Sequence, residues 1–124
     1  MVTLYGLKNC DSCRKARRAL ESQGLDIRFI DLRAGVTGQG LDDALLDRLL
    51  QGAGWERLLN KQSTTWRGLD EADKQDLDES KARRLLKAHP TLIKRPLLDT
   101  GERLIVGFDA AAYARLSTAL NAAG

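Results

Sequence analysis

Apolar residues alternate with polar ones, or recur at helical spacing, along most of this chain. Residues 2–6 form a short apolar run that ends in a glycine, and residues 27–31 alternate as a half-buried strand does. Between these runs, small or apolar residues recur on one helix face, at Cys13, Ala16, Ala19 and Leu20. The pattern predicts a βαβ unit in the first third of the chain, with both cysteines at the turn from the first strand into the helix.

Polar residues mark both ends of this first helix. Asp11 or Ser12 is the expected N-cap, because either side chain can accept a hydrogen bond from the unpaired amides of the first turn. The Gln-Gly pair at 23–24 supplies the stop. We therefore expect Cys13 to face inward from the helix, while Cys10 stays in the preceding loop.

Residues at about 35–90 are expected to form a helical insertion. After a glycine-rich loop, apolar residues mark an amphipathic helix at Leu41, Leu45, Leu49 and Leu50. Shorter helices are expected at 55–59 and 70–77, whereas the polar stretch 60–68 is expected to be irregular. Asp78 is the expected N-cap of the last helix of the insertion.

The end of the chain has the pattern of a β-hairpin followed by a helix. Residues 92–98 and 103–107 are the two strands, and the turn between them is Asp99-Thr100-Gly101-Glu102. Asp109 is expected to cap a last helix with an apolar face made by Ala112, Tyr113, Leu116 and Leu120. The order βαβ, helical insertion, ββα predicts a single thioredoxin-like α/β domain over residues 1–124.

Length and composition agree with one globular domain. The chain has 124 residues, of which 43% are hydrophobic and 30% charged. No apolar run approaches the roughly 20 residues of a membrane helix, and the first residues do not resemble a secretory signal. We expect a cytoplasmic protein without a membrane partner. The net charge of +3 is mild, with 20 basic against 17 acidic residues, so no direct nucleic-acid binding is expected.

The two cysteines are too few and too close together for a disulfide framework, so a chemical role is expected. Together with His89, the only histidine, they could supply at most three metal ligands, and no metal site is expected.

Cys10 is the candidate nucleophile. At the start of a helix, unpaired amides and the positive end of the helix dipole favour a thiolate over a thiol. Five basic residues lie near it in the sequence, which should lower its pKa further and attract anions: Lys8, Arg14, Lys15, Arg17 and Arg18. The alternative interpretation of this cluster is the solvated face of a helix. Cys10 itself could alternatively be an inert buried cysteine.

Cys13 completes a C-x-x-C pair with Cys10. This spacing lets the second thiol resolve a mixed disulfide formed on the first. Cys13 could equally be a small core residue beside Ala16 and Leu20, and the two interpretations are compatible.

Arg95 and Pro96 open the strand expected to lie beside the first one. In this architecture Pro96 is a candidate cis-proline that faces the cysteine loop, and Arg95 would then reach the thiolate. The alternative is an ordinary trans proline at the start of an edge strand.

With these residues in view, the chain resembles the family that holds the plasmid-type arsenate reductases, the YffB-like reductases and the Spx regulators. The resemblance rests on Thr3-Leu4-Tyr5 before Cys10, Lys15-Ala16-Arg17, Leu58-Leu59-Asn60-Lys61, Thr64-Thr65-Trp66-Arg67, His89-Pro90, Ile93-Lys94-Arg95-Pro96 and Val106-Gly107-Phe108. It covers nearly the whole chain. The motifs at 60–67 and 106–108 look most like the YffB branch.

The resemblance implies site residues and also shows departures from the family pattern. It places the nucleophile on Cys10 and an anion-binding arginine, before a cis-proline, on Arg95. Arsenate reductases have further arginines where this chain has Asn60 and Gly107, so little or no arsenate reduction is expected. YffB-like members generally lack the second cysteine, whereas Spx regulators share the C-x-x-C followed by Arg-Lys-Ala-Arg, as at Cys13 and after it.

We therefore expect a thiol-disulfide reductase, with glutathione as the implied co-substrate and no bound cofactor. Cys10 would attack a small-molecule or protein disulfide, and Cys13 or a second glutathione would resolve the product. Lys8, Arg14, Arg95 and Pro96 are the expected substrate-binding residues. Two alternatives remain: a redox-sensing regulator of the Spx kind that binds RNA polymerase, and an arsenate reductase.

Overall fold

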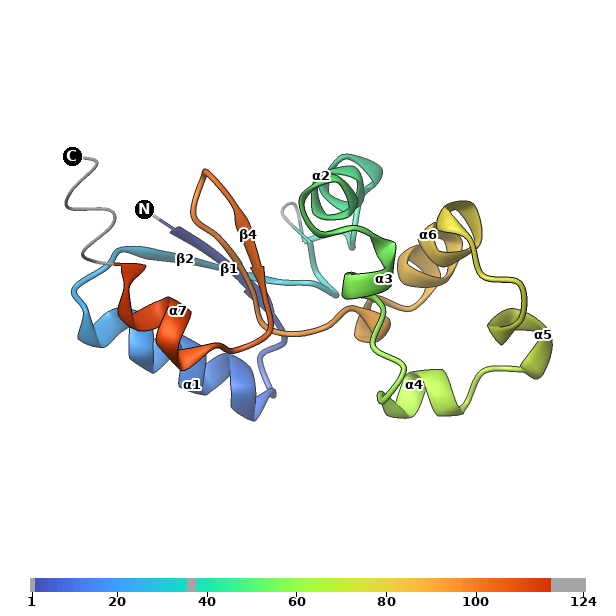
Figure 1. The fold of residues 1–124 in the computed structure, drawn as a ribbon, viewed down its shortest axis with the longest axis horizontal. Coiled ribbons are helices and arrows are strands. Elements are labelled where there is room, and N and C mark those ends of the chain that lie inside the picture. Colours follow the sequence, from blue (N-terminus) through green and yellow to red (C-terminus); the bar gives the residue numbers. More distant parts are fainter. Residues whose placement is uncertain (1, 36–37, 117–124) are drawn as a thin grey trace. The chain divides into compact units, whose positions relative to one another are not determined.

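The computed structural model describes residues 2–35 and 38–116. The chain separates into two compact units (Figure 1). The first unit contains the chain up to Ile30 and again from Arg95 onward, and the second contains Asp31–Lys94. The helical insertion expected at about 35–90 lies within the second unit. That the chain is a single domain stays a prediction.

The first unit is built on a four-stranded sheet. Its strands are β1 (Val2–Gly6), β2 (Ile27–Asp31), β3 (Leu97–Asp99) and β4 (Leu104–Val106), in the order β2-β1-β3-β4. The pairs β1·β3 and β3·β4 are antiparallel, with Leu98 opposite both Leu4 and Ile105. The expected hairpin is therefore confirmed, and its first strand lies beside β1 as expected, but this strand begins at Leu97 and not at residue 92, because residues 90–92 form a 3-10 turn.

Two helices of the first unit, α1 (Asp11–Ser22) and α7 (Ala110–Ala114), contact each other on one side of the sheet (Figure 1). Their inner faces and the sheet form a core of Val2, Leu4, Ala16, Leu20, Leu98, Tyr113 and Leu116. Each fully buried large apolar side chain in such a core contributes about 1.5–3 kcal/mol. The side chain of Asp109 accepts a hydrogen bond from the Ala112 amide at 3.1 Å, which confirms the expected cap of the last helix. Leu120, expected on the same face, lies outside the described residues.

The N-cap of α1 is Cys10, and the expectation of Asp11 or Ser12 was wrong. Cys10 has an extended backbone, with φ −113° and ψ 121°, and its carbonyl already accepts the first helical hydrogen bond, from the Arg14 amide at 3.0 Å. Asp11 lies in the first turn, where its carboxylate pairs with Arg14 at 2.6 Å and with the helix dipole. The helix thus begins directly after the cysteine.

The second unit is mostly helical. It contains α2 (Asp43–Ala53), α3 (Trp55–Leu58), α4 (Thr64–Arg67), α5 (Glu71–Lys74), α6 (Glu79–Ala88) and the 3-10 turn η1 (Pro90–Leu92). The side chain of Asp78 accepts from the Lys81 amide at 2.8 Å, as expected for the cap of α6. Leu41 is buried but precedes α2, whose N-cap is Asp42, so the expected helix begins later.

The polar stretch 60–68 is not wholly irregular, contrary to expectation. It contains the one-turn helix α4, which begins where the Ser63 hydroxyl accepts a hydrogen bond from the Trp66 amide at 3.1 Å. No residue of α4 is fully buried. An apolar periodicity therefore could not reveal this helix, because capping and not burial defines it.

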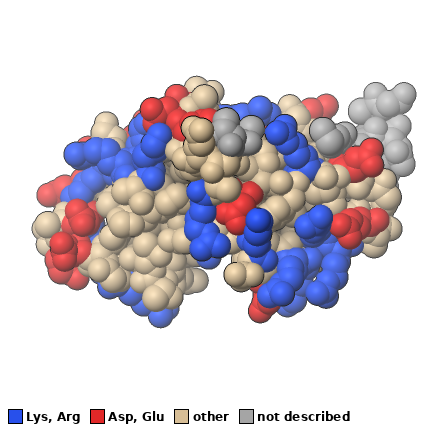
Figure 2. All heavy atoms as spheres, turned by 180° about the vertical axis from the view of Figure 1, so that it is seen from behind, with Lys and Arg blue, Asp and Glu red and all other residues tan. Residues whose placement is uncertain are grey.

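No helix within residues 2–35 and 38–116 is long and apolar enough to cross a membrane. Acidic and basic side chains are interspersed over the face shown in Figure 2, in keeping with the small net charge.

Candidate functional site

The turn from β1 into α1 presents the two cysteines differently. Cys10, at the helix N-terminus, is half-buried, whereas Cys13, one turn further on, is 2% exposed and belongs to the core. Both thiols are free. The inward orientation expected for Cys13 is confirmed, and so is the place of Cys10 at the entry to the helix.

The surroundings of Cys10 favour its thiolate. Burial alone would raise the pKa of this thiol, but hydrogen bonding from the Cys13 thiol and the Cys13 amide opposes that effect. A hydrogen bond from Arg95 and its positive charge lower the pKa further, and the combined result is a pKa below the ordinary value. A thiol ionised more easily than usual is the form that attacks a disulfide.

Cys13 is affected in the opposite direction. Burial raises the pKa of this thiol to about 12, and its role as hydrogen-bond donor to Cys10 adds to the increase. The backbone amide of Leu7 opposes these effects in part. One thiol of the pair is therefore activated while the other is held protonated.

A glycine that sequence reasoning did not single out makes room for the second thiol. A Cβ placed on Gly6 would meet Cys13 Sγ at 2.5 Å and Cys13 Cβ at 3.2 Å, so no larger residue fits without moving the cysteine. The strand-ending glycine in the sequence was a turn signal, and only the packing of α1 against β1 gives it this second role.

Arg95 and Pro96 are joined by a cis peptide bond, so the alternative of an ordinary trans proline is wrong. Pro96 is buried, and its carbonyl accepts a hydrogen bond from the Gly107 amide at 2.8 Å. The segment leads into β3, the neighbour of β1, and this pairing brings the Arg95 guanidinium within reach of the Cys10 sulfur.

Lys8 and Arg14 lie on the side of Cys13. They line a pocket of about 260 Å³ within the first unit, whose other lining residues are Leu7, Cys13, Arg17 and Phe29. The predicted substrate-binding residues therefore lie in two places. Arg95, which is followed by Pro96, lies at Cys10. Lys8 and Arg14 line the pocket beside Cys13.

Arg17 and Phe29 are pocket residues that sequence reasoning did not place in the site. The Arg17 guanidinium lies 5.7 Å from the centroid of the Phe29 ring. The helical spacing of residues 10, 13, 14 and 17 was the available signal for Arg17, whereas nothing in the sequence placed Phe29 on β2 beside it. Lys15 and Arg18 are exposed and do not line this pocket, whereas Arg14 and Arg17 do, so the solvated-face interpretation fits only part of the cluster.

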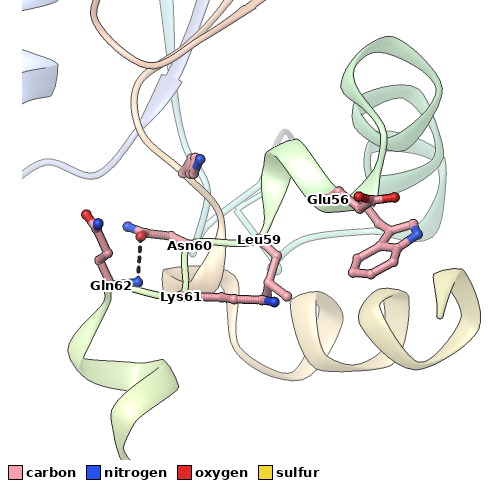
Figure 3. A pocket seen from close by; sticks show the side chains of 7 residues that line it. Glu56, Leu59, Asn60, Lys61 and Gln62 are labelled. Atoms are coloured by element: carbon pink, nitrogen blue, oxygen red, sulfur yellow. Dashed lines mark hydrogen bonds between the residues drawn. The ribbon is translucent and has the colours of Figure 1, made fainter. Parts of the chain in front are cut away.

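The second unit has a pocket of its own, of about 390 Å³, beside Asn60 (Figure 3). Its lining consists of Trp55, Glu56, Leu59, Asn60, Lys61, Gln62 and Lys94. The Asn60 side-chain oxygen accepts a hydrogen bond from the Gln62 amide at 3.0 Å, drawn as a dashed line in Figure 3. The side chain of Asn60 is therefore hydrogen-bonded within its own turn. The family resemblance implies an arginine at this position in arsenate reductases.

Across the described parts of the chain, 2–35 and 38–116, no three or more His, Cys, Asp or Glu residues are grouped so that they could hold a metal ion.

Comparison with known proteins gives this site a context. Residues 5–116 match the ArsC family. The solved structure of the YffB protein is 45% identical and superposes with a TM-score of 0.83, covering 92% of this chain and 96% of its own. An arsenate reductase (ArsC) related protein from Brucella melitensis is also 45% identical, with a TM-score of 0.72 and 90% of each chain covered.

A transcriptional regulator is among the relatives as well. The global transcriptional regulator Spx of Bacillus subtilis is 28% identical over 109 residues, which are 88% of this chain and 81% of the regulator. The match to the family extends over most of the chain and includes the cysteine turn, the insertion and the hairpin, and the fold is the thioredoxin-like one that the sequence predicted. The chain belongs to the ArsC family.

Proposed function

We propose that this protein is a cytoplasmic thiol-disulfide oxidoreductase in which Cys10 is the nucleophile. The observation that carries the proposal is the opposite shift of the two thiol pKa values at the start of α1, downward at Cys10 and upward at Cys13. Strongly shifted pKa values are typical of functional sites, where a lowered pKa activates a nucleophilic thiol.

In the proposed reaction, the Cys10 thiolate attacks one sulfur of a disulfide. A bond forms between that sulfur and Cys10 Sγ, the substrate S–S bond breaks, and the second sulfur leaves as a thiolate. Cys13, once it has lost its proton, then attacks Cys10 Sγ and releases the first substrate sulfur, or a second thiol molecule attacks the substrate sulfur and releases Cys10. Glutathione is the proposed co-substrate, and because the electrons arrive through thiol exchange, no bound cofactor is required.

Arg95 is proposed to stabilise the Cys10 thiolate and to hold an anionic group of the substrate, with Pro96 shaping the site beside it. Lys8 and Arg14 are proposed to attract the carboxylates of the substrate, as a cationic side chain beside a reactive thiol does in charge-assisted recognition. Arg14 already makes a 2.6 Å ion pair with Asp11. The pair is exposed, so exchange for a substrate carboxylate costs little.

Turnover of a glutathione mixed disulfide with a small thiol is the direct test of this proposal. We expect catalysis by the wild-type protein and a glutathione adduct, or a disulfide between the two cysteines, in its intact mass after treatment with glutathione disulfide. A protein that stays fully reduced under these conditions and shows no turnover would contradict the proposal.

A second candidate function is redox sensing with binding to RNA polymerase. It is supported by the C-x-x-C pair and by the relationship to the Spx regulator. This function predicts capture of RNA polymerase that differs between the oxidised and reduced protein, without turnover of disulfides. Arsenate reduction is the least supported activity, because Asn60 and Gly107 stand where charged donors would be needed.

A further inference from the structure

The hydroxyl of Tyr113 is a buried polar group that has no part in the proposed reaction. Tyr113 is 1% exposed, and its hydroxyl has no hydrogen-bond partner among the described residues. Burial of an unpaired hydroxyl destabilises a fold, and a phenylalanine at this position would avoid that cost. A buried polar group without a partner therefore requires an explanation, and one explanation is a role in a charged state that forms only during a reaction.

Tyr113 packs against the face of α1 that carries Cys13. Its side chain belongs to the core cluster that also contains Ala16, and Cys13 is the buried residue one turn before Ala16 on the same helix face. A Cβ on Gly6 would lie 2.5 Å from Cys13 Sγ and 3.5 Å from Phe29, so the cysteine sulfur adjoins a ring that packs against this cluster. A negative charge on Cys13 raises the pKa of Tyr113, so the two side chains interact electrostatically.

The Tyr113 hydroxyl is held in place and stays protonated. The side-chain amide of Gln23, at the end of α1, donates a hydrogen bond to the Tyr113 carbonyl at 2.6 Å and ties the two helices together. The Phe108 ring packs against the tyrosine ring edge to face, with centroids 5.1 Å apart. Burial raises the pKa of the hydroxyl above its ordinary value, and negative charges on Cys13 and Asp109 raise it further. The group can therefore serve as a hydrogen donor and not as a base.

Resolution by Cys13 requires a negative charge to form in the core. The thiol must lose its proton before the sulfur can attack Cys10 Sγ, and burial is the largest effect that opposes this ionisation. The Leu7 amide and the positive charge of Arg95 act against burial, yet the pKa of Cys13 still rises to about 12. An additional donor that acts on this sulfur would therefore speed the resolving step.

Building on the function proposed above, we propose that the Tyr113 hydroxyl stabilises the Cys13 thiolate during the resolving step. A hydroxyl hydrogen rotates to suit its surroundings, so the O–H dipole of Tyr113 can turn toward the sulfur once that sulfur is negative. The low dielectric of the core strengthens the interaction, and among the described residues the hydroxyl has no other partner to give up. A donor that folding has already desolvated needs no reorganisation when the charge appears.

The resolving step starts from a mixed disulfide between Cys10 and the substrate. Cys13 loses its proton to water, and its thiolate forms a bond to Cys10 Sγ. The bond between Cys10 and the substrate sulfur breaks, its electron pair leaves on that sulfur, and the released thiolate takes up a proton from water. The two cysteines are thereby oxidised to a disulfide, and the substrate disulfide is reduced to two thiols. Tyr113 keeps its proton throughout.

One time course with glutathione disulfide separates the two steps. The reduced full-length protein is mixed with glutathione disulfide, quenched with acid at intervals, alkylated and weighed by intact mass spectrometry. The glutathione adduct rises as Cys10 reacts and falls as the internal disulfide forms. We expect Tyr113→Phe to leave the rise unchanged and to slow the fall on the order of 10-fold. The ratio of reduced to internally oxidised protein in a glutathione redox buffer should not change, because neither state contains the Cys13 thiolate.

Two control variants separate the hydroxyl from the packing of its ring. Phe108→Leu removes the ring contact but keeps the hydroxyl, and it should resolve the adduct at the wild-type rate. In a Cys13→Ser background, added glutathione must release the adduct. There Tyr113→Phe should have no effect, because the hydroxyl acts only through the Cys13 sulfur.

Resolution at the wild-type rate in folded Tyr113→Phe, equal slowing in Phe108→Leu, or slowing that persists in the Cys13→Ser background would each overturn the inference. So would a wild-type adduct that never gives way to the internal disulfide. Failure of the proposed function looks different, because the wild-type protein would then form neither the adduct nor the internal disulfide. Normal formation and resolution of the adduct in Tyr113→Phe would remove this inference alone.

Discussion

Arg95 acts on the sulfur of Cys10 from the opposite part of the sequence, both as a hydrogen-bond donor and as a positive charge. The contact arises because the segment into β3 runs beside the end of β1, where the cysteine turn begins. This interaction links the segment before the hairpin to the start of the first helix. Its removal should be measurable in the reactivity of one thiol.

Replacing Arg95 by Gln is expected to raise the pKa of Cys10, because a hydrogen bond and a charge that favour the thiolate are lost. The rate of alkylation by iodoacetamide at neutral pH should fall several-fold, and its inflection should move to higher pH. Arg18→Gln is the matched control, since Arg18 is exposed on α1. Equal pH profiles for the wild type and Arg95→Gln would contradict the assigned role of Arg95.

The two cysteines should fail in different ways when each is replaced by serine. Cys10→Ser is expected to abolish reaction with disulfides, because a hydroxyl is too weakly acidic to supply the nucleophile near neutral pH. Cys13→Ser should keep the first step and accumulate a mixed disulfide on Cys10, which intact mass spectrometry detects after brief exposure to glutathione disulfide. Loss of the first step in a folded Cys13→Ser protein would show that the roles of attacking and resolving thiol are wrongly assigned.

Gly6→Ala should destabilise the protein through Cys13. The added methyl would meet Cys13 Sγ at 2.5 Å, and overpacking of this kind costs about 1–3 kcal/mol in the free energy of unfolding. Urea unfolding of the single variants and of Gly6→Ala combined with Cys13→Ala measures the coupling. In the double variant the sulfur is gone and most of the loss should disappear. Strictly additive losses would mean that the contact with the sulfur is not the cause.

Tyr113→Phe is expected to leave stability unchanged or to increase it by up to about 1 kcal/mol. The hydroxyl of Tyr113 is buried and has no hydrogen-bond partner among the described residues, so its removal ends a desolvation cost. The edge-to-face contact with Phe108, with ring centroids 5.1 Å apart, is retained in this variant. Phe108→Leu, which loses that contact, should instead cost about 0.5–1.5 kcal/mol. Destabilisation by Tyr113→Phe as large as by Phe108→Leu would show that the hydroxyl is bonded.

The sequence alone determined the features that depend on neighbours along the chain. The first strand and helix, the inward face of Cys13, the caps at Asp78 and Asp109 and the terminal hairpin follow from periodicity and capping. These signals are local, because a helix face or a cap needs only residues three or four positions apart. The roles of the site residues in catalysis stay predictions.

Only the tertiary structure decided which distant groups meet the two thiols. Sheet pairing brings Arg95 to Cys10, and packing of α1 on the sheet sets Gly6 against Cys13 and Phe29 beside Arg17. The structure also makes Cys10 the N-cap of α1, whereas side-chain type had favoured Asp11 or Ser12. Such contacts depend on strand order and on the closeness of packed layers, and neither of these is encoded in the spacing of residues within one segment.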